Sequence, residues 1–195
     1  MKERLMLIAL VLIGVLATYE LATFRRVEVA PRSVPRHFTP PVLEVADGPV
    51  FAWPIHEDDY IALSSPYGER DPETVGGDVS DFHSGLDLFG TWHARIVSIS
   101  DGVVLEHYPP PDNWWKGHPV LGGYLRIGHY DGTEAVYAHL SSTEVHEGDT
   151  VKRGQYIGRQ GNTGISDGEH LHIEIRIGGN LVNPLQYIKE PRSKS

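Results

Sequence analysis

Short β-branched runs broken by glycine dominate the chain between Phe51 and Ile188, and they restrict it to a fold built from strands. The clearest runs are residues 95–99, 103–106, 124–127, 134–139 and 170–177. Asp101-Gly102 and Asp131-Gly132 fall between neighbouring runs, and each predicts a hairpin turn. The 21 glycines and 14 prolines among 195 residues favour turns over long helices. We therefore expect a mainly β fold, an antiparallel meander or barrel-like sheet, and not a helical bundle.

Composition excludes several classes of function. The chain has no cysteine, which removes disulfide scaffolds, thiolate nucleophiles and cysteine-ligated zinc together. Its net charge of -9 argues against non-specific nucleic-acid binding, which needs many basic residues to neutralise phosphates. Any metal ion in this protein must therefore be bound by histidines and carboxylates.

The N-terminus has the pattern of an export segment. Lys2 and Arg4 precede an uncharged apolar run from Leu5 to Ala17. This run is short for a spanning helix, which needs about 20 residues, but a mostly apolar pattern continues to Phe24. We predict that residues 1–24 are either a cleaved signal peptide or an uncleaved signal-anchor helix. A buried core helix is disfavoured because the run has no polar face.

The remainder divides into three parts. Residues 25–51 contain five prolines with little apolar periodicity, which predicts an extended tether. Residues 52–189 hold the strand pattern and form the predicted folded domain. Residues 190–195 are polar and predict a flexible tail. Either form of the N-terminal segment places the domain outside the cytoplasm, in the periplasm, and the uncleaved form anchors it to the inner membrane.

The strand at residues 170–177 separates apolar from polar side chains. Because faces alternate along a strand, Leu171, Ile173, Ile175 and Ile177 face one way, and His170, His172, Glu174 and Arg176 face the other. Two imidazoles on one polar face, with an aliphatic row behind them, suit a metal site or a catalytic site.

A second segment offers the remaining metal ligands. His83 and Asp87 cannot bind one ion from a straight strand, because four extended residues span about 13 Å. Gly85 allows the chain to bend between them. With His172 they make two histidines and one carboxylate, the ligand number of a catalytic zinc with an open position. Taken alone, the His-x-His and His-x-x-x-Asp motifs are short enough to occur by chance in a chain with 11 histidines. The local sequence around His83 fits a surface-loop histidine equally well.

Seven segments together resemble the lysostaphin-type (LytM-domain) zinc endopeptidases, in the order found in that family. They are Ser65-Pro66-Tyr67-Gly68-Glu69-Arg70, His83 to Asp87, Asp101 to Val104, Tyr137-Ala138-His139-Leu140, Gly148 to Gly158, Gly161-Asn162-Thr163-Gly164 and His170 to Glu174. The resemblance covers about residues 52 to 188, and such ordered agreement is far more specific than any one motif.

The resemblance implies a fold, an activity and a set of site residues. The family's fold is similar to a barrel-sandwich hybrid, with an antiparallel sheet that forms an open groove. His83, Asp87 and His172 match the family's zinc ligands, and His139 and His170 match its two non-ligand active-site histidines. Members cut peptide bonds in the stems or cross-bridges of bacterial peptidoglycan. Some relatives lack these residues and act only as activators of other hydrolases, and this chain keeps all five.

Two features depart from the family. Glu169 stands where proline usually precedes the His-x-His, and we expect it to face away from His170 and to affect substrate choice. The insert from Tyr108 to Leu121, with Trp114-Trp115, is longer than expected and either walls the groove or packs onto the sheet.

The expected chemistry follows from one zinc ion. Zinc would lower the pKa of a bound water toward 7 and polarise the scissile carbonyl. One of His139 and His170 would take the water's proton and the other would stabilise the oxyanion, and the sequence leaves the assignment open. Without the resemblance to the family, the sequence would favour His139 as a strand-end histidine that is hydrogen-bonded to the backbone. Glu174 is expected to orient a histidine or pair with Arg176. The other histidines are assigned to surface or packing roles: His37, His56, His93, His107, His118, His129 and His146.

Two further functions compete with the exported zinc endopeptidase. The first is a non-catalytic envelope module that binds peptidoglycan or a partner hydrolase and keeps zinc only for structure. The second is a lipoyl or biotinyl carrier, which the glycine turns of residues 145–158 suggest. The carrier lacks a convincing modification lysine at a hairpin tip and leaves the histidines unexplained.

Overall fold

The described part of the protein is mainly β, as the sequence predicts. The structure is a computed structural model that describes residues 51–71, 81–110 and 118–188. The predicted export segment, nearly all of the tether, the tail and Trp114-Trp115 lie outside these residues. Within the described residues no helix has the length and apolar character needed to span a membrane.

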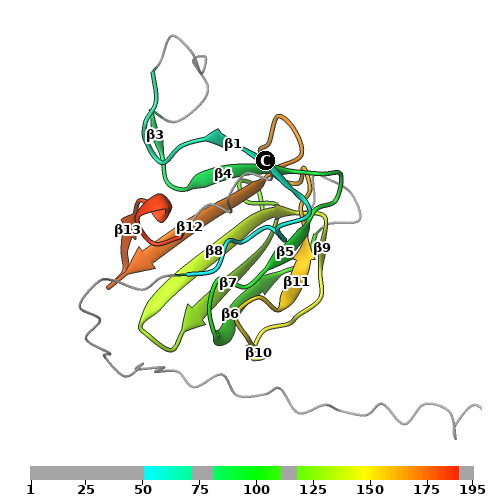
Figure 1. Ribbon diagram of the computed structural model, residues 1–195, viewed down its shortest axis with the longest axis vertical. Helices are drawn as coiled ribbons and strands as arrows, with labels where there is room; N and C mark the ends of the chain where they lie inside the picture. The colour runs from blue at the N-terminus through cyan, green and yellow to red at the C-terminus, as the bar shows by residue number, and fades with distance from the viewer. Residues whose placement is uncertain (1–50, 72–80, 111–117, 189–195) are drawn as a thin grey trace, which may run out of the picture. The chain divides into compact units, whose positions relative to one another are not determined.

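An eight-stranded antiparallel sheet forms the larger layer (Figure 1). Seven of its strands follow the order β1 (Tyr60–Ser65), β4 (Leu86–Gly90), β12 (Leu171–Ile177), β8 (Thr133–Leu140), β7 (Gly123–His129), β6 (Gly102–Tyr108) and β10 (Thr150–Val151). The eighth, β13 (Asn180–Val182), pairs with the C-terminal half of β12. Strand β12 therefore lies between β4 and β8, although β4 is more than eighty residues away in the sequence.

Smaller elements complete the fold. A three-stranded sheet has the order β5 (Arg95–Val97), β11 (Tyr156–Arg159) and β9 (Ser142–Thr143), and a two-stranded sheet joins β2 (Gly68–Glu69) to β3 (Phe82–His83). The chain also forms a short 3-10 helix, η1 (Pro184–Gln186).

The apolar face of β12 lies in the main core. Leu171, Ile173 and Ile175 have no exposed surface, and they pack with residues of both larger sheets, including Leu88 of β4 and Ile157 of β11. Burying side chains of this size contributes about 1.5–3 kcal/mol each. The core therefore fixes β12 in register and leaves His172 and Glu174 on its opposite face, as the alternation predicts.

One of the two predicted hairpins is wrong. The Asp131-Gly132 turn does join β7 to β8. The Asp101-Gly102 segment instead joins β5 to β6, which belong to different sheets. Gly102 is already part of β6, where an added Cβ would lie 2.4 Å from the Gly128 carbonyl oxygen of β7. Gly102 thus allows β6 and β7 to approach closely, and it does not form a turn.

Candidate metal centre

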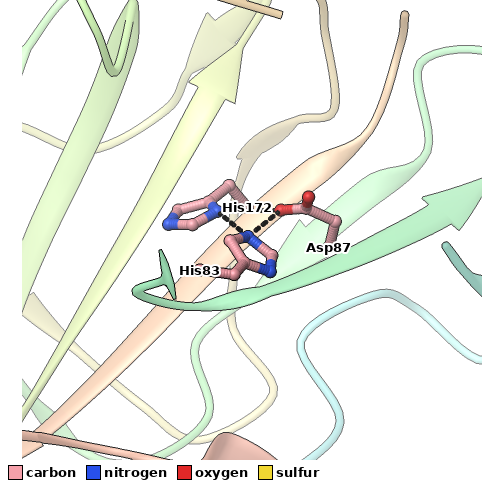
Figure 2. Close-up of side chains that lie close together, drawn as sticks. All are labelled: His83, Asp87 and His172. Carbon is pink, nitrogen blue, oxygen red and sulfur yellow. Dashed lines mark hydrogen bonds and ion pairs between the residues drawn. The ribbon is translucent and has the colours of Figure 1, made fainter. Parts of the chain in front are cut away.

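Three side chains from three strands converge on one point. His83 ends β3, Asp87 lies in β4, and His172 lies opposite Asp87 in the neighbouring β12. Figure 2 shows the three side chains pointing toward one another. His83 Nε2 is 3.0 Å from Asp87 Oδ1, His172 Nδ1 is 2.8 Å from the same oxygen, and the two nitrogens are 3.1 Å apart. The structure therefore brings together all three sequence-predicted ligands.

A break between β3 and β4 makes this convergence possible, as expected from Gly85. The glycine serves a further purpose that the sequence did not indicate. A Cβ at this position would lie 2.6 Å from His172 Cε1 and 2.6 Å from the Ile173 carbonyl oxygen. Glycine therefore leaves the room that the His172 ring occupies beside β4.

The outer partners determine which ring nitrogens carry hydrogen. His83 Nδ1 lies 2.7 Å from the Pro66 carbonyl oxygen, which can only accept, so Nδ1 is the donor. His172 Nε2 faces Glu174 Oε1 at 3.7 Å, which favours a hydrogen on Nε2. In the neutral rings, the nitrogens that face Asp87 are then unprotonated. A fixed tautomer of this kind is typical of metal-binding histidines.

The donor set fits a zinc ion. Two imidazole lone pairs and a carboxylate oxygen repel one another unless a proton or a cation lies between them. Three ligands of a tetrahedral zinc lie about 3.3 Å apart, given bonds of about 2.0–2.1 Å. The separations of 2.8–3.1 Å are slightly shorter, so a small outward movement of the side chains accommodates the ion. His83, Asp87 and His172 can thus hold zinc and leave a fourth position open.

Electrostatics at the site favour an ionised carboxylate. Burial alone would raise the pKa of the Asp87 carboxyl, but hydrogen bonds with His172 and His83 outweigh it and hold that pKa well below its usual range. Arg70 Nη2 lies 3.6 Å from Asp87 Oδ2, the oxygen that points away from the histidines. Burial lowers the pKa of His172, but hydrogen bonds with Asp87 and Glu174 raise it to about 9. A metal ion at this site competes with the proton that these partners favour on His172.

His170 lies beside the three candidate ligands. Its Nε2 is 3.7 Å from Asp87 Oδ1, and its Nδ1 is 2.9 Å from the Gly168 carbonyl oxygen. Since this carbonyl can only accept, Nδ1 carries the hydrogen and the neutral ring presents an unprotonated Nε2 to the site.

His139 reaches the site through an unusual backbone conformation. Regular alternation would place Tyr137 and His139 on one face of β8. The structure does not: Tyr137 is in the core, whereas the His139 ring lies 4.7 Å from that of His170 and 5.8 Å from that of His172, centroid to centroid. The φ angle of His139 is 62°, which interrupts the alternation of side chains. Its Nδ1 donates to the Thr163 carbonyl oxygen at 2.8 Å, so its Nε2 is also left as an acceptor. Burial, reinforced by His170, lowers the pKa of His139 to about 4.

Glu174 makes both contacts expected of it. One carboxylate oxygen faces His172 Nε2, and the other accepts from Arg176 Nη2 at 2.9 Å. Burial would raise its pKa, but hydrogen bonds with His172, Ser84 and Arg176 lower it to about 2.

Sequence reasoning missed several groups around the site. The carbonyls of Pro66 and Thr163 fix two histidine tautomers, and residue type does not reveal such main-chain acceptors. Arg70 belongs to one of the seven family-like segments, but its residue type does not indicate the contact with Asp87. His93, assigned a surface or packing role, contacts Glu169, which is itself only 10% exposed at the side chain.

The fold and the site together define a class of β-rich protein with a candidate His-Asp-His metal centre, and comparison with known proteins identifies the family. Residues 81–184 match the model of peptidase family M23, and the chain belongs to this family. A solved zinc-containing peptidase from Vibrio cholerae is 30% identical with a TM-score of 0.59, over 74% of this chain and 41% of that one.

Curated relatives include both peptidases and an activator. An uncharacterised metalloprotease of Haemophilus influenzae is 35% identical over 68% of this chain and 26% of its own. The DD-carboxypeptidase/endopeptidase Mpg of Neisseria meningitidis is 36% identical over 65% of this chain and 27% of its own. The murein hydrolase activator NlpD of Salmonella dublin is 36% identical over 55% of this chain and 26% of its own. The chain thus spans about a quarter of the length of these relatives.

Proposed function

We propose that this protein is a zinc-dependent endopeptidase that hydrolyses peptide bonds in the stems or cross-links of peptidoglycan. The observation that carries the proposal is the convergence of His83, Asp87 and His172 beside two further histidines whose Nδ1 atoms donate to backbone carbonyls. Family membership and the names of relatives such as the DD-carboxypeptidase/endopeptidase Mpg support this substrate class.

In this mechanism the chain's residues divide the work. His83, Asp87 and His172 hold zinc, which, when bound, polarises the scissile carbonyl and makes water nucleophilic at neutral pH. His139 and His170 each present Nε2 as an acceptor. One of them accepts the proton of the attacking water, and the resulting imidazolium passes it to the leaving nitrogen.

Digestion of purified peptidoglycan tests the activity. Release of soluble fragments with new amino termini is expected, together with its loss on chelation and its return with added zinc. No release by zinc-loaded protein of confirmed stoichiometry would contradict the proposal.

The second candidate is an envelope module that binds peptidoglycan or regulates a partner hydrolase, and the similarity to the activator NlpD favours it. His139→Ala separates the two functions. In an enzyme this variant keeps zinc and loses about 10²–10⁴-fold in turnover, because proton transfer is impaired. In a regulator it keeps its cellular role.

We further propose an extracytoplasmic, periplasmic location, since peptidoglycan lies outside the cytoplasm. The positively charged start and the apolar run of residues 5–17 support export. Cell fractionation of the full chain and of a variant lacking residues 2–24 tests this. An unchanged location in the shortened variant would contradict it.

A further inference from the structure

Among the described residues, two that are not glycine have a left-handed backbone, His93 (φ 54°) and His139 (φ 62°). This conformation is unfavourable for a residue with a side chain, and it persists where surrounding contacts over-determine it. His139 belongs to the proposed catalytic pair. His93 lies in the turn between β4 and β5 and has no role in the mechanism above, so the contacts that hold it need an explanation.

Every backbone polar group of His93 and one ring nitrogen are engaged. Its N–H donates to Glu169 Oε1 at 2.5 Å, and its carbonyl oxygen accepts from Arg159 Nη1 at 3.0 Å. Its ring Nδ1 lies 3.0 Å from Ser141 Oγ. The Ser141 hydroxyl donates to the Gln160 carbonyl oxygen at 2.7 Å, so its oxygen is available to accept from Nδ1–H. Contacts to three separate segments therefore fix the conformation of His93.

Two of these partners lie next to the proposed catalytic histidines in the sequence. Glu169 immediately precedes His170, and Ser141 follows His139 by two residues. The rings of His139 and His170 lie 4.7 Å apart. His93 thus connects, through the side chains of Glu169 and Ser141, the segment that carries one member of the pair to the segment that carries the other.

Glu169 is suited to this role because its side chain is only 10% exposed. A shielded carboxylate oxygen that accepts a backbone N–H makes a directional contact with little competition from water. Removing it leaves the His93 N–H without this partner and releases the chain just before His170. This contact differs from the effect on substrate choice that the sequence suggested for Glu169.

We propose that His93, Glu169 and Ser141 form a positioning cluster that fixes His139 and His170 relative to one another for catalysis. The proposal rests on the proposed peptidase function. The three residues act through the backbone that carries the histidines, and they touch neither substrate nor metal. Their removal should reduce kcat, since misplacement of a reacting group by about 1 Å can reduce turnover about 100-fold.

Substitutions at Glu169 test the contact between its carboxylate and the His93 N–H. We expect Glu169→Ala to lower kcat on soluble cross-linked muropeptides at least about tenfold, with KM and zinc content unchanged. Glu169→Gln retains an oxygen acceptor and should restore most of kcat. Asp167→Ala removes the same charge from an exposed position of the same loop and is the matched control. A Gln variant as impaired as the Ala variant, or an Ala variant equal to the control, would overturn the proposal.

Ser141→Ala tests the contact between the Ser141 hydroxyl and His93 Nδ1. It also keeps the proposal testable if Glu169→Ala does not fold. It removes the nearer acceptor of His93 Nδ1 and leaves the Gln160 carbonyl oxygen at 3.4 Å, so kcat should again fall while zinc content is retained. Ser142→Ala is the control, because it removes a neighbouring buried hydroxyl that has no hydrogen-bond partner. Equal kcat in the two variants would contradict the role of Ser141.

Ring NMR spectra of the zinc-loaded full chain provide a readout that does not depend on activity. The ring C–H resonances of His139 and His170 should shift in Glu169→Ala and Ser141→Ala and stay in place in Asp167→Ala and Ser142→Ala. Unshifted resonances in both test variants would overturn the positioning role. If the wild-type protein cleaves no peptidoglycan, the proposed function fails, whereas these spectra still decide whether the cluster positions the two rings.

Discussion

Asp87 is the residue on which both candidate histidine ligands depend, since its Oδ1 is within 3.0 Å of each. Asp87→Ala should therefore reduce zinc affinity by at least about 100-fold, more than the loss of an outer partner. Zinc content after dialysis against a metal buffer measures this. Asp81→Ala, at an exposed position, should bind zinc as the wild type does. Full zinc occupancy in the Asp87 variant would exclude it as a ligand.

Gly85 supports the site by leaving space. A methyl group there would meet His172 Cε1 and the Ile173 backbone at 2.6 Å, so Gly85→Ala must displace the ring or the strand. We expect about 1–3 kcal/mol loss of stability and weaker zinc binding, measured by urea unfolding and metal titration. Gly168→Ala is the control because a Cβ there meets no atom within 4 Å. Wild-type values for Gly85→Ala would show that β4 and β12 have more room than the structure indicates.

At the scale of the element, the end of β8 stores backbone strain that glycine would relieve. His139 has a φ angle of 62°, which is unfavourable by about 1–2 kcal/mol for a residue with a Cβ. His139→Gly should therefore be more stable than His139→Ala by about 1 kcal/mol. Urea unfolding of the two variants measures the difference directly. Greater stability of the alanine variant would mean that the segment relaxes to another conformation.

Strand β12 shows how far the alternation of side chains determines an element. Its apolar residues lie in the core and its polar residues on the other face, as the sequence predicts. The same rule fails on β8 at His139, because one left-handed residue reverses the direction of the side chain. Residue type alone does not signal this reversal, since a positive φ is uncommon for any residue with a Cβ, although histidine is enriched there together with asparagine and aspartate. Alternation therefore predicts the site where a strand is regular and misses it where the strand is distorted.

At the scale of the whole molecule, a buried histidine distant from the site links stability to pH. His129 has no exposed surface, and its Nε2 has no hydrogen-bond partner. Burial lowers its pKa below the usual value of 6.5. The unfolded chain then binds more protons than the folded one, so this contribution to stability is present above pH 6.5 and is lost as pH falls through the lowered folded-state pKa.

Urea unfolding at pH 5 and pH 7.5 tests this linkage. The wild type should lose more stability on acidification than His129→Gln, which cannot titrate. An equal loss in both proteins would assign the pH dependence to other groups. The comparison with the variant is necessary because His172, whose pKa is raised, contributes with the opposite sign.

The strands and the convergence of His83, Asp87 and His172 follow from the sequence because both depend on local patterns and family motifs. The division into two larger sheets does not, since Asp101-Gly102 has the residues of a turn but the environment of a strand. The role of His93 also escapes sequence reasoning, because its partners come from three distant segments. Long-range contacts thus account for what the sequence alone does not predict.

The position of β12 between β4 and β8 has a consequence for when the candidate metal centre forms. His83 and His172 are 89 positions apart, and pairing of β4 with β12 brings their nitrogens within 3.1 Å. A newly made or unfolded chain does not have this arrangement, so it has no assembled candidate metal centre. Metal binding at these residues therefore requires the long-range pairing of β4 with β12, and the separate local segments do not suffice.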